Sequence, residues 1–170
     1  MKNRKLGRSV IVSVLVVGVA LAAIWAALPV TIASAAELNQ GGVALENLLK
    51  REQIVLNNQQ ERLTLSQQAV EKAQQWLADL QAEGKDVAAL QAALSAFQNG
   101  LAQAQTSFNT AKQALDAHAG FDASGKVTNA AQALKTLVDA GRAERQFHLT
   151  ITQATLDFRA AVRAYLQANK

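Results

Sequence analysis

The sequence predicts an all-α protein, an antiparallel up-down-up bundle of three long helices that follows an N-terminal signal helix. Two observations predict the helices. After Pro29 the chain has no further proline and is rich in Ala, Gln and Leu, which are strong helix formers. Its apolar residues then recur every seven positions over three stretches, at about 43–82, 87–118 and 129–168. The connections between these stretches are short enough for consecutive helices to be antiparallel neighbours.

The first 35 residues have the three-part pattern of a secretory signal. The start is basic and contains no acid: Lys2, Arg4, Lys5 and Arg8. An apolar run over 10–28 follows, and after Pro29 come the small residues 33–36, with cleavage expected after Ala35. Residues 36–170 would then form a single helical-bundle domain. The apolar run is also long enough to cross a bilayer, so an uncleaved membrane anchor is the alternative. Both interpretations place the bulk of the chain outside the cytoplasm, in the periplasm or secreted.

The charge distribution argues against nucleic acid as a partner. The chain has 17 Lys and Arg against 13 Asp and Glu, a formal net charge of +4. Residues 1–36 contain four basic residues and no acid, so the expected signal carries the whole excess. The rest is neutral, its charges are interspersed, and few aromatic residues lie among them. Cysteine is absent, so an exported form must be stabilised by packing rather than by disulfides.

The first predicted helix begins just after Gly41-Gly42 and stops at Gly84. One apolar row has members seven residues apart: Leu49, Leu56, Leu63, Val70 and Leu77. The neighbouring row contains Glu52, Gln59 and Ser66, so this helix is expected to have a partly polar inner seam.

The second predicted helix has two apolar rows. One consists of Val87, Leu94, Leu101, Phe108 and Leu115, and the other of Leu90, Phe97, Ala104, Ala111 and His118. Asp86 is placed to cap the N-terminus. Asn99-Gly100 resembles a turn, but the seven-residue phase continues through it and favours one unbroken helix.

The third predicted helix follows Thr128 as its N-cap and ends near Ala168. Its inner stripe is expected to consist of Leu134, Leu137, Val138, Gly141, Ile151, Phe158, Val162, Tyr165 and Leu166. Gly141 is expected to pack against Phe108 as a small residue opposite a large one. The acidic residues are expected on the outer faces of the helices.

The histidines and the polar loop are the candidate sites. His148 falls on the inner side of the third helix. It is either a ligand or general base, or a core histidine hydrogen-bonded to Ser66, to Gln59 or to a backbone carbonyl. His118 suits the negative end of the second helix. The loop 120–128 fits no register of a calcium-binding EF-hand and is expected to be a tight polar turn. We predict no catalytic, cofactor-binding or metal-ligating residue, and no cofactor.

Two short segments share the pattern L-T-x-x-Q. The first contains Leu63, Thr64 and Gln67, and the second Leu149, Thr150 and Gln153. Paired motifs of this kind resemble those of the small periplasmic stress proteins of the Spy and CpxP type. The resemblance implies an ATP-independent holdase chaperone or an envelope-stress modulator that holds clients on a helical surface. The run 117–128 is also similar to uncharacterised secreted bacterial helical proteins, a likeness that implies no function.

The sequence therefore favours a non-enzymatic extracytoplasmic helical bundle that acts by protein interaction or as a structural spacer. The alternatives are the holdase chaperone or stress modulator, and a ligand- or cofactor-binding bundle centred on His148. The expected partner is an unknown protein or a second copy of the chain. Contact with a membrane is expected only through an uncleaved N-terminal segment, and nucleic acid is not expected as a partner.

Overall fold

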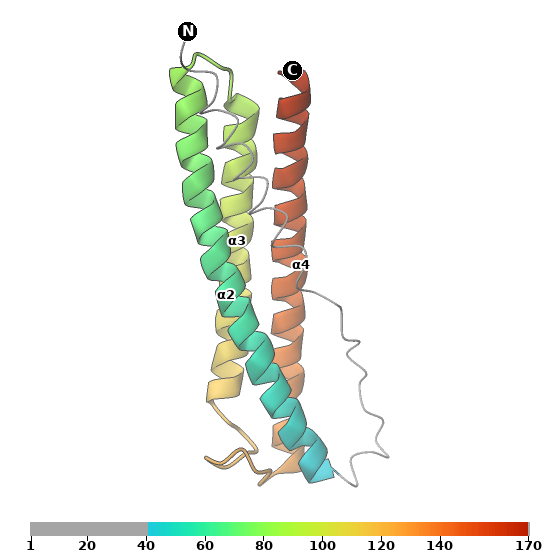
Figure 1. The fold of residues 1–170 in the computed structure, drawn as a ribbon. Coiled ribbons are helices and arrows are strands. Elements are labelled where there is room, and N and C mark those ends of the chain that lie inside the picture. Colours follow the sequence, from blue (N-terminus) through green and yellow to red (C-terminus); the bar gives the residue numbers. More distant parts are fainter. Residues whose placement is uncertain (1–40, 170) are drawn as a thin grey trace. The chain divides into compact units, whose positions relative to one another are not determined.

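The chain forms three long helices in the part that the computed structural model describes, residues 41–169. They are α2 (Gly41–Ala82), α3 (Ala88–Asp116) and α4 (Ala130–Ala168), shown in Figure 1. No strand occurs within this range, and Phe121 and Val127 form an isolated bridge in the connection between α3 and α4. The all-α class and the approximate helix bounds are thus confirmed. The predicted signal segment and its cleavage site lie outside the described residues.

The described residues divide into two compact units, and each unit contains part of every helix. Unit 1 comprises residues 62–102 and 150–169, and unit 2 comprises residues 41–61 and 103–149. Aromatic pairs mark the core of unit 1. Trp76 meets Tyr165 edge-on with ring centroids 6.0 Å apart, and Phe97 stacks on Phe158 at 5.5 Å. Such pairs stabilise a core by about 0.5–1.5 kcal/mol beyond the area they bury.

The first helix follows its predicted pattern and ends as predicted. All five members of the row from Leu49 to Leu77 are buried. Gly84 adopts a positive φ of 74°. The amide of Gly84 donates to the carbonyl of Gln81, and that of Lys85 to the carbonyl of Leu80, at 2.9 and 3.0 Å. These two bonds satisfy carbonyls that the helix end would otherwise leave unpaired.

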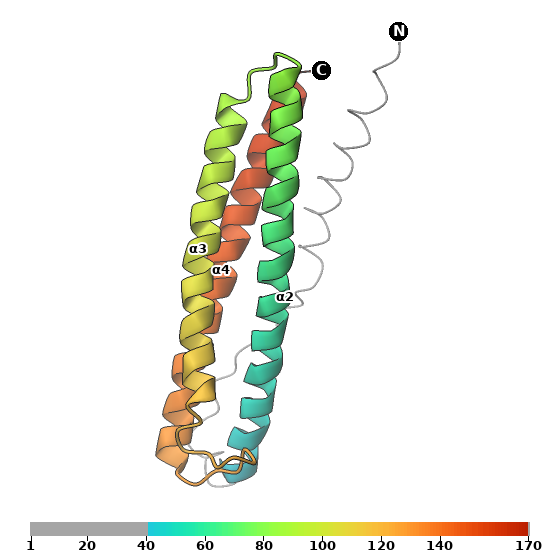
Figure 2. The same cartoon turned by 90° about the vertical axis from the view of Figure 1, so that its left-hand side faces the viewer.

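The second helix is continuous through Asn99-Gly100, as its seven-residue phase predicts (Figure 2). Asp86 accepts a hydrogen bond from the amide of Ala88 at 3.0 Å and so caps the helix start. The glycine at position 100 has a packing role rather than a turn role. A Cβ added there would lie 2.6 Å from the Cβ of Ala154, so α3 and α4 approach each other closely at this point in unit 1.

The third helix differs from prediction in its cap and in its inner face. Asn129, not Thr128, caps the start, because its Oδ1 accepts from the amide of Gln132 at 3.1 Å. The inner face of α4 between 133 and 151 contains only three large apolar residues, and the others are alanines or polar residues: Ala133, Thr136, Leu137, Ala140, Ala143, Glu144, Phe147 and Ile151. Leu134 and Val138 are instead 37% and 39% exposed.

Gly141 also differs from its predicted role. A Cβ at this position would meet no atom within 4 Å, so it does not pack against Phe108. The physical reason is that the buried rows of α4 are Ala133-Ala140-Phe147 and Leu137-Glu144-Ile151. Alanines fill one row where helices approach closely, which leaves Leu134, Val138 and Gly141 on the outer side.

Candidate functional site

A buried carboxyl group in contact with a second, half-buried one is the most unusual chemical feature of unit 2. Glu144 lies on α4 in the same seven-residue row as Leu137 and Ile151, and only 5% of its surface is exposed. Its side chain hydrogen-bonds the carboxyl group of Glu52, which comes from the inner seam of α2. A second carboxyl group in contact with a buried one disfavours its ionisation, so this contact favours a proton on Glu144.

The surroundings favour the protonated form of Glu144. Burial, followed by the hydrogen bond and charge of Glu52, raises the pKa of Glu144 to about 10, while the cationic Arg51 acts in the opposite direction. The side chain keeps one oxygen, Oε1, without a hydrogen-bond partner among the protein atoms. At neutral pH Glu144 is therefore a buried neutral acid. An unsatisfied buried acceptor costs about 1–3 kcal/mol.

Gln59 completes this cluster from α2. It is fully buried, and its Nε2 donates to the backbone carbonyl of Glu144 at 3.2 Å. Its Oε1 has no hydrogen-bond partner. We call Glu52, Gln59 and Glu144 the carboxyl cluster. The spacing predicted Glu52 and Gln59 on the inner seam of α2, but the prediction that the acids of α4 lie on its outer face is wrong for Glu144. Its spacing of seven residues from Leu137 and from Ile151 was the signal that marks it.

Unit 1 buries a different polar group. Arg62 on α2 is 9% exposed, and its Nη2 donates to Oγ1 of Thr152 on α4 at 3.1 Å. Burial lowers the pKa of Arg62, but a guanidinium is so strong a base that it stays charged at physiological pH. Ser66 is also fully buried in unit 1, and its Oγ has no hydrogen-bond partner.

The two candidate histidines lie in unit 2, His148 on α4 and His118 just beyond α3. His148 is half-buried on α4, one turn after Glu144. Ser66 Oγ and Gln59 Oε1 form no hydrogen bond, so the predicted bonds from His148 to these two atoms do not form, whereas the predicted bond to a backbone carbonyl stays a prediction. The core positions that follow Glu144 are filled by Phe147 and Ile151. His118 lies just beyond α3 with a positive φ of 47°, and its Nδ1 is 3.2 Å from the carbonyl of Asp116.

The two L-T-x-x-Q segments occupy different positions on their helices. Leu63 is buried in the core of unit 1, whereas Leu149 is 54% exposed on unit 2. Thr64 and Gln67 are exposed on α2. On α4 Thr150 is half-buried, and the exposed Gln153 donates to Asp157 at 2.8 Å. The same five-letter pattern therefore presents different side chains to the core and to solvent.

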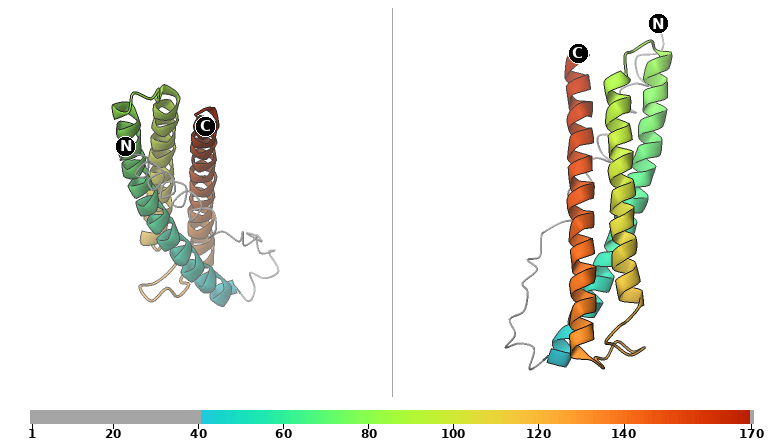
Figure 3. Two further views of the ribbon diagram at one scale, coloured as in Figure 1. Left: turned by 45° about the horizontal axis from the view of Figure 1, so that its top comes forward. Right: turned by 180° about the vertical axis from the view of Figure 1, so that it is seen from behind.

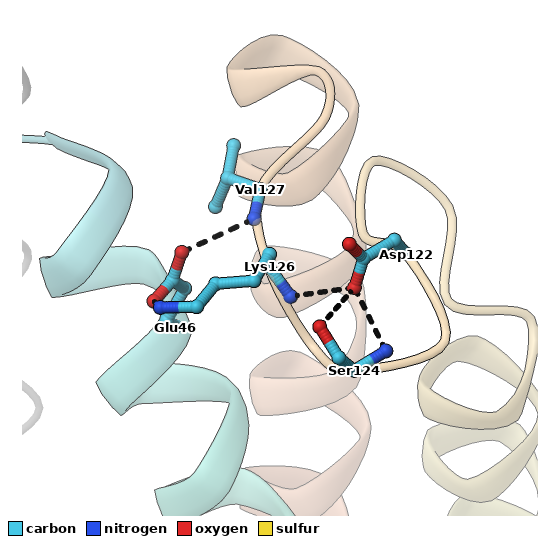
Figure 4. Close-up of polar contacts among 5 residues, drawn as sticks. All are labelled: Glu46, Asp122, Ser124, Lys126 and Val127. Carbon is cyan, nitrogen blue, oxygen red and sulfur yellow. Dashed lines mark hydrogen bonds and ion pairs between the residues drawn. The ribbon is translucent and has the colours of Figure 1, made fainter.

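The polar loop between α3 and α4 (Figure 3) is held by its own side chains and by Glu46 of α2 (Figure 4). Asp122 Oδ1 accepts from the amide and hydroxyl of Ser124 and from the amide of Lys126, at 2.8, 2.7 and 3.0 Å. Lys126 Nζ and the amide of Val127 donate to Glu46 on α2, at 2.8 and 3.3 Å.

These bonds give the loop an internal structural role. The hydrogen bonds of Ser124 and Lys126 lower the pKa of Asp122. The bond from Lys126, joined by that from the Val127 amide, lowers the pKa of Glu46. Both carboxylates thus stay ionised at neutral pH and hold the loop, as expected for a tight polar turn. Among residues 41–169 no group of three or more His, Cys, Asp or Glu side chains is placed to hold a metal ion.

Two surface features of unit 2 bear on what the protein can bind. A groove of about 680 Å³ between α3 and α4 is lined by small and polar residues, among them Thr110, Arg142 and Gln146. No member of the carboxyl cluster lines it. Large apolar side chains also lie exposed on the outer side of α4, at Leu134, Val138 and Leu149. No helix within 41–169 has the length and apolar character needed to cross a membrane.

Comparison with protein-family models, with curated proteins and with solved structures finds no match to this chain. Its function is therefore argued from its own residues.

Proposed function

We propose that this chain is a non-enzymatic, extracytoplasmic helical protein that binds another protein through the outer side of α4 in unit 2. The observation that carries the proposal is a stripe along one side of that helix, which we call the α4 stripe. It consists of four exposed residues and one half-buried glycine: Leu134, Val138, Arg145, Leu149 and Gly141. Their spacing of three or four residues places them in line on one helical face.

The α4 stripe has the chemistry of a protein-binding surface. Its three large apolar side chains are 37–54% exposed. Covering apolar surface is favourable by about 25 cal/mol per Å², so a partner that buries them gains several kcal/mol. Gly141 leaves open space in the middle, where a partner's side chain can approach the backbone. Exposed apolar residues gathered in this way mark interaction sites more often than isolated ones do.

The charges beside the stripe indicate the kind of partner. Arg145 is exposed within the stripe and Arg142 is exposed beside it. Two further charged residues of this part of α4, the exposed Lys135 and the half-buried Asp139, form an ion pair with each other. The face therefore carries an excess of positive charge. It suits an amphipathic segment whose apolar residues are flanked by Asp or Glu.

A peptide-binding experiment tests this function. The purified chain is titrated into a fluorescent amphipathic peptide with acidic flanking residues, and into a matched peptide with Lys at those positions. We expect tighter binding of the acidic peptide, and at least a tenfold loss on changing Val138→Gln together with Leu149→Gln. Ile54→Gln is the control, since Ile54 is a 61% exposed apolar residue of α2 in the same unit. Equal binding of both peptides, or equal loss from the control, would contradict the proposal.

The finer arrangement belongs to the same proposal. We infer an up-down-up order of the helices, preceded by a signal segment that directs export. The short segment between α2 and α3 supports a reversal there. Within unit 1, Arg62 contacts Thr152 and Trp76 contacts Tyr165, so residue numbers increase in the same direction along α2 and α4. An up-down-up order requires this parallel direction of its first and third helices. Mass spectrometry of the mature N-terminus tests export, and Ala36 is the expected first residue.

A holdase chaperone is the second candidate. Each L-T-x-x-Q segment contains one exposed leucine, Leu65 at 43% and Leu149 at 54%. Exposed apolar side chains are what a holdase uses to retain an unfolding client. Suppressed aggregation of an unrelated unfolding protein, abolished by Leu65→Gln with Leu149→Gln, would favour this candidate. No suppression at several-fold molar excess would remove it.

A further inference from the structure

We propose that Glu52 and Glu144 form a proton-dependent latch between α2 and α4 in unit 2, which holds while the two carboxyl groups share a proton and weakens when that proton is lost. The latch is a property of the core of unit 2 and does not depend on the proposed binding face. Its test therefore fails or succeeds independently of the peptide experiment.

The geometry makes the contact conditional on protonation. Only 5% of the surface of Glu144 is exposed, and its hydrogen bond to Glu52 needs a proton between the two carboxyl groups. Losing that proton turns the hydrogen bond into a repulsion between two carboxylates in a medium that screens charge poorly. Gln59 directs its amide nitrogen at the backbone carbonyl of Glu144, at 3.2 Å, and the carboxyl oxygen Oε1 of Glu144 receives no hydrogen bond.

The charged groups around Glu144 do not compensate for the loss. From α2 the facing groups are Glu52 and the cationic Arg51, whose attraction is smaller than the effect of burial. On α4 itself His148 lies one turn further along, and the adjacent Arg145 is exposed.

Within residues 41–169, neither α3 nor the loop between α3 and α4 supplies a cation to this position. The only charged residues of α3 are Lys112 and Asp116, which are exposed and paired with each other. The acidic and basic side chains of the loop, Asp122 and Lys126, are exposed. Lys126 pairs with Glu46, and Asp122 accepts bonds from within the loop.

The sign of the pH effect follows from linkage. The folded pKa of Glu144 is raised above its ordinary value of 4.5, so its contribution is fully present below about pH 4.5 and is lost as the pH rises toward about 10. Within this window one such proton makes unfolding up to about tenfold more favourable per pH unit. Glu46, Asp122 and Asp139 have lowered pKa values, so their contributions to stability are lost only as the pH falls below the ordinary pKa of a carboxyl group. Mildly acidic conditions should therefore stabilise unit 2 most.

Urea unfolding of the purified full-length chain between pH 5 and pH 8 tests the latch. A His148→Gln background removes the histidine nearest to Glu144. In this background the unfolding equilibrium constant should rise with pH, by up to about tenfold per unit.

Glu144→Gln keeps a hydrogen-bond donor that cannot ionise, so its profile of unfolding against pH should be nearly flat. Glu61→Gln removes an exposed carboxylate of α2 in the same unit and should keep the steep profile. Parallel profiles for the background and for Glu144→Gln would overturn the proposal.

A direct measurement covers the case in which Glu144→Gln does not fold. Carbon-13 NMR of glutamate side-chain carboxyl groups in the unaltered chain should show one glutamate still protonated at pH 7. Hydrogen exchange, corrected for its intrinsic pH dependence, should show protection of residues 45–61 and 137–149 falling as the pH rises, with residues 88–102 unchanged. If every glutamate titrates near its ordinary value, the latch does not exist.

Discussion

Unit 1 and unit 2 are built from the same three helices, yet they bury polar groups of different kinds. Unit 1 buries Arg62, a cation at every physiological pH, which donates to Thr152. Unit 2 buries Glu144 against Glu52, a pair whose charge depends on its proton. A buried polar contact can therefore be permanent or conditional according to the side chain alone. The seven-residue scaffold specifies where such a group sits, and the chemistry of the group decides whether the contact responds to pH.

The largest effect we predict tests whether the apolar core of unit 2 holds the carboxyl cluster in place. Phe147 is fully buried on α4, one turn from Glu144. Phe147→Ala should lower the free energy of unfolding by about 3–5 kcal/mol, because it removes a large buried ring and leaves a cavity. Urea unfolding monitored by circular dichroism measures this.

The matched control lies two residues further along the same helix. Leu149 is 54% exposed, so Leu149→Ala should change the free energy of unfolding by no more than about 0.5 kcal/mol. If Phe147→Ala costs less than about 1 kcal/mol, unit 2 does not depend on this part of α4. The two units would then differ in their buried polar groups but not in a dependence of those groups on the surrounding apolar core.

The helices differ in how well sequence predicted them, and the reason is side-chain size. On α2 and α3 the inner rows are mostly large apolar residues such as Leu49, Leu94 and Phe108, so their spacing identified them. On α4 the inner face includes Ala133 and Ala140 together with Glu144. Hydrophobic size therefore pointed to Leu134 and Val138, on the outer side. Small residues are buried where two helices approach each other closely, and the sequence of one helix does not reveal its distance from the next.

The candidate site was less predictable than the fold. Gln59 and Ser66 lie on the seam that the spacing indicated, but their partners depend on which residue of another helix stands opposite. The loop illustrates the same limit. Its polar composition predicted a tight turn, whereas the bonds from Lys126 and Val127 to Glu46 join residues about 80 positions apart. Such pairings are decided by the packing of whole helices.

The second prediction concerns the connection that closes unit 2. Gly120 has a positive φ of 89°, and a Cβ there would lie 2.1 Å from the backbone nitrogen of Ala133. Gly120→Ala should therefore lower the free energy of unfolding by about 3 kcal/mol, since the strained φ and the collision with backbone both oppose it. Thermal unfolding reports the loss.

Gly125 provides the comparison that isolates the collision. It also has a positive φ, of 81°, but a Cβ there would make only an ordinary contact at 3.6 Å with the side chain of Leu49. Gly125→Ala should cost about 1 kcal/mol, from the backbone conformation alone. Equal losses at the two glycines would show that the approach of the loop to Ala133 does not constrain unit 2.

The smallest predicted effect compares one substitution at two helical glycines, one in each unit. In a helix interior Gly→Ala is favourable by about 1 kcal/mol when the added methyl group has room. Gly141 in unit 2 has that room, so Gly141→Ala should stabilise the chain by about this amount.

At Gly100 in unit 1 the new methyl carbon would lie 2.6 Å from that of Ala154, and overpacking of this kind costs about 1–3 kcal/mol. Gly100→Ala should therefore destabilise by up to about 2 kcal/mol, and adding Ala154→Gly should recover part of the loss by removing the colliding methyl group. Urea unfolding of the single and double variants gives the signs. Stabilisation by Gly100→Ala would mean that α3 and α4 do not approach each other closely in unit 1.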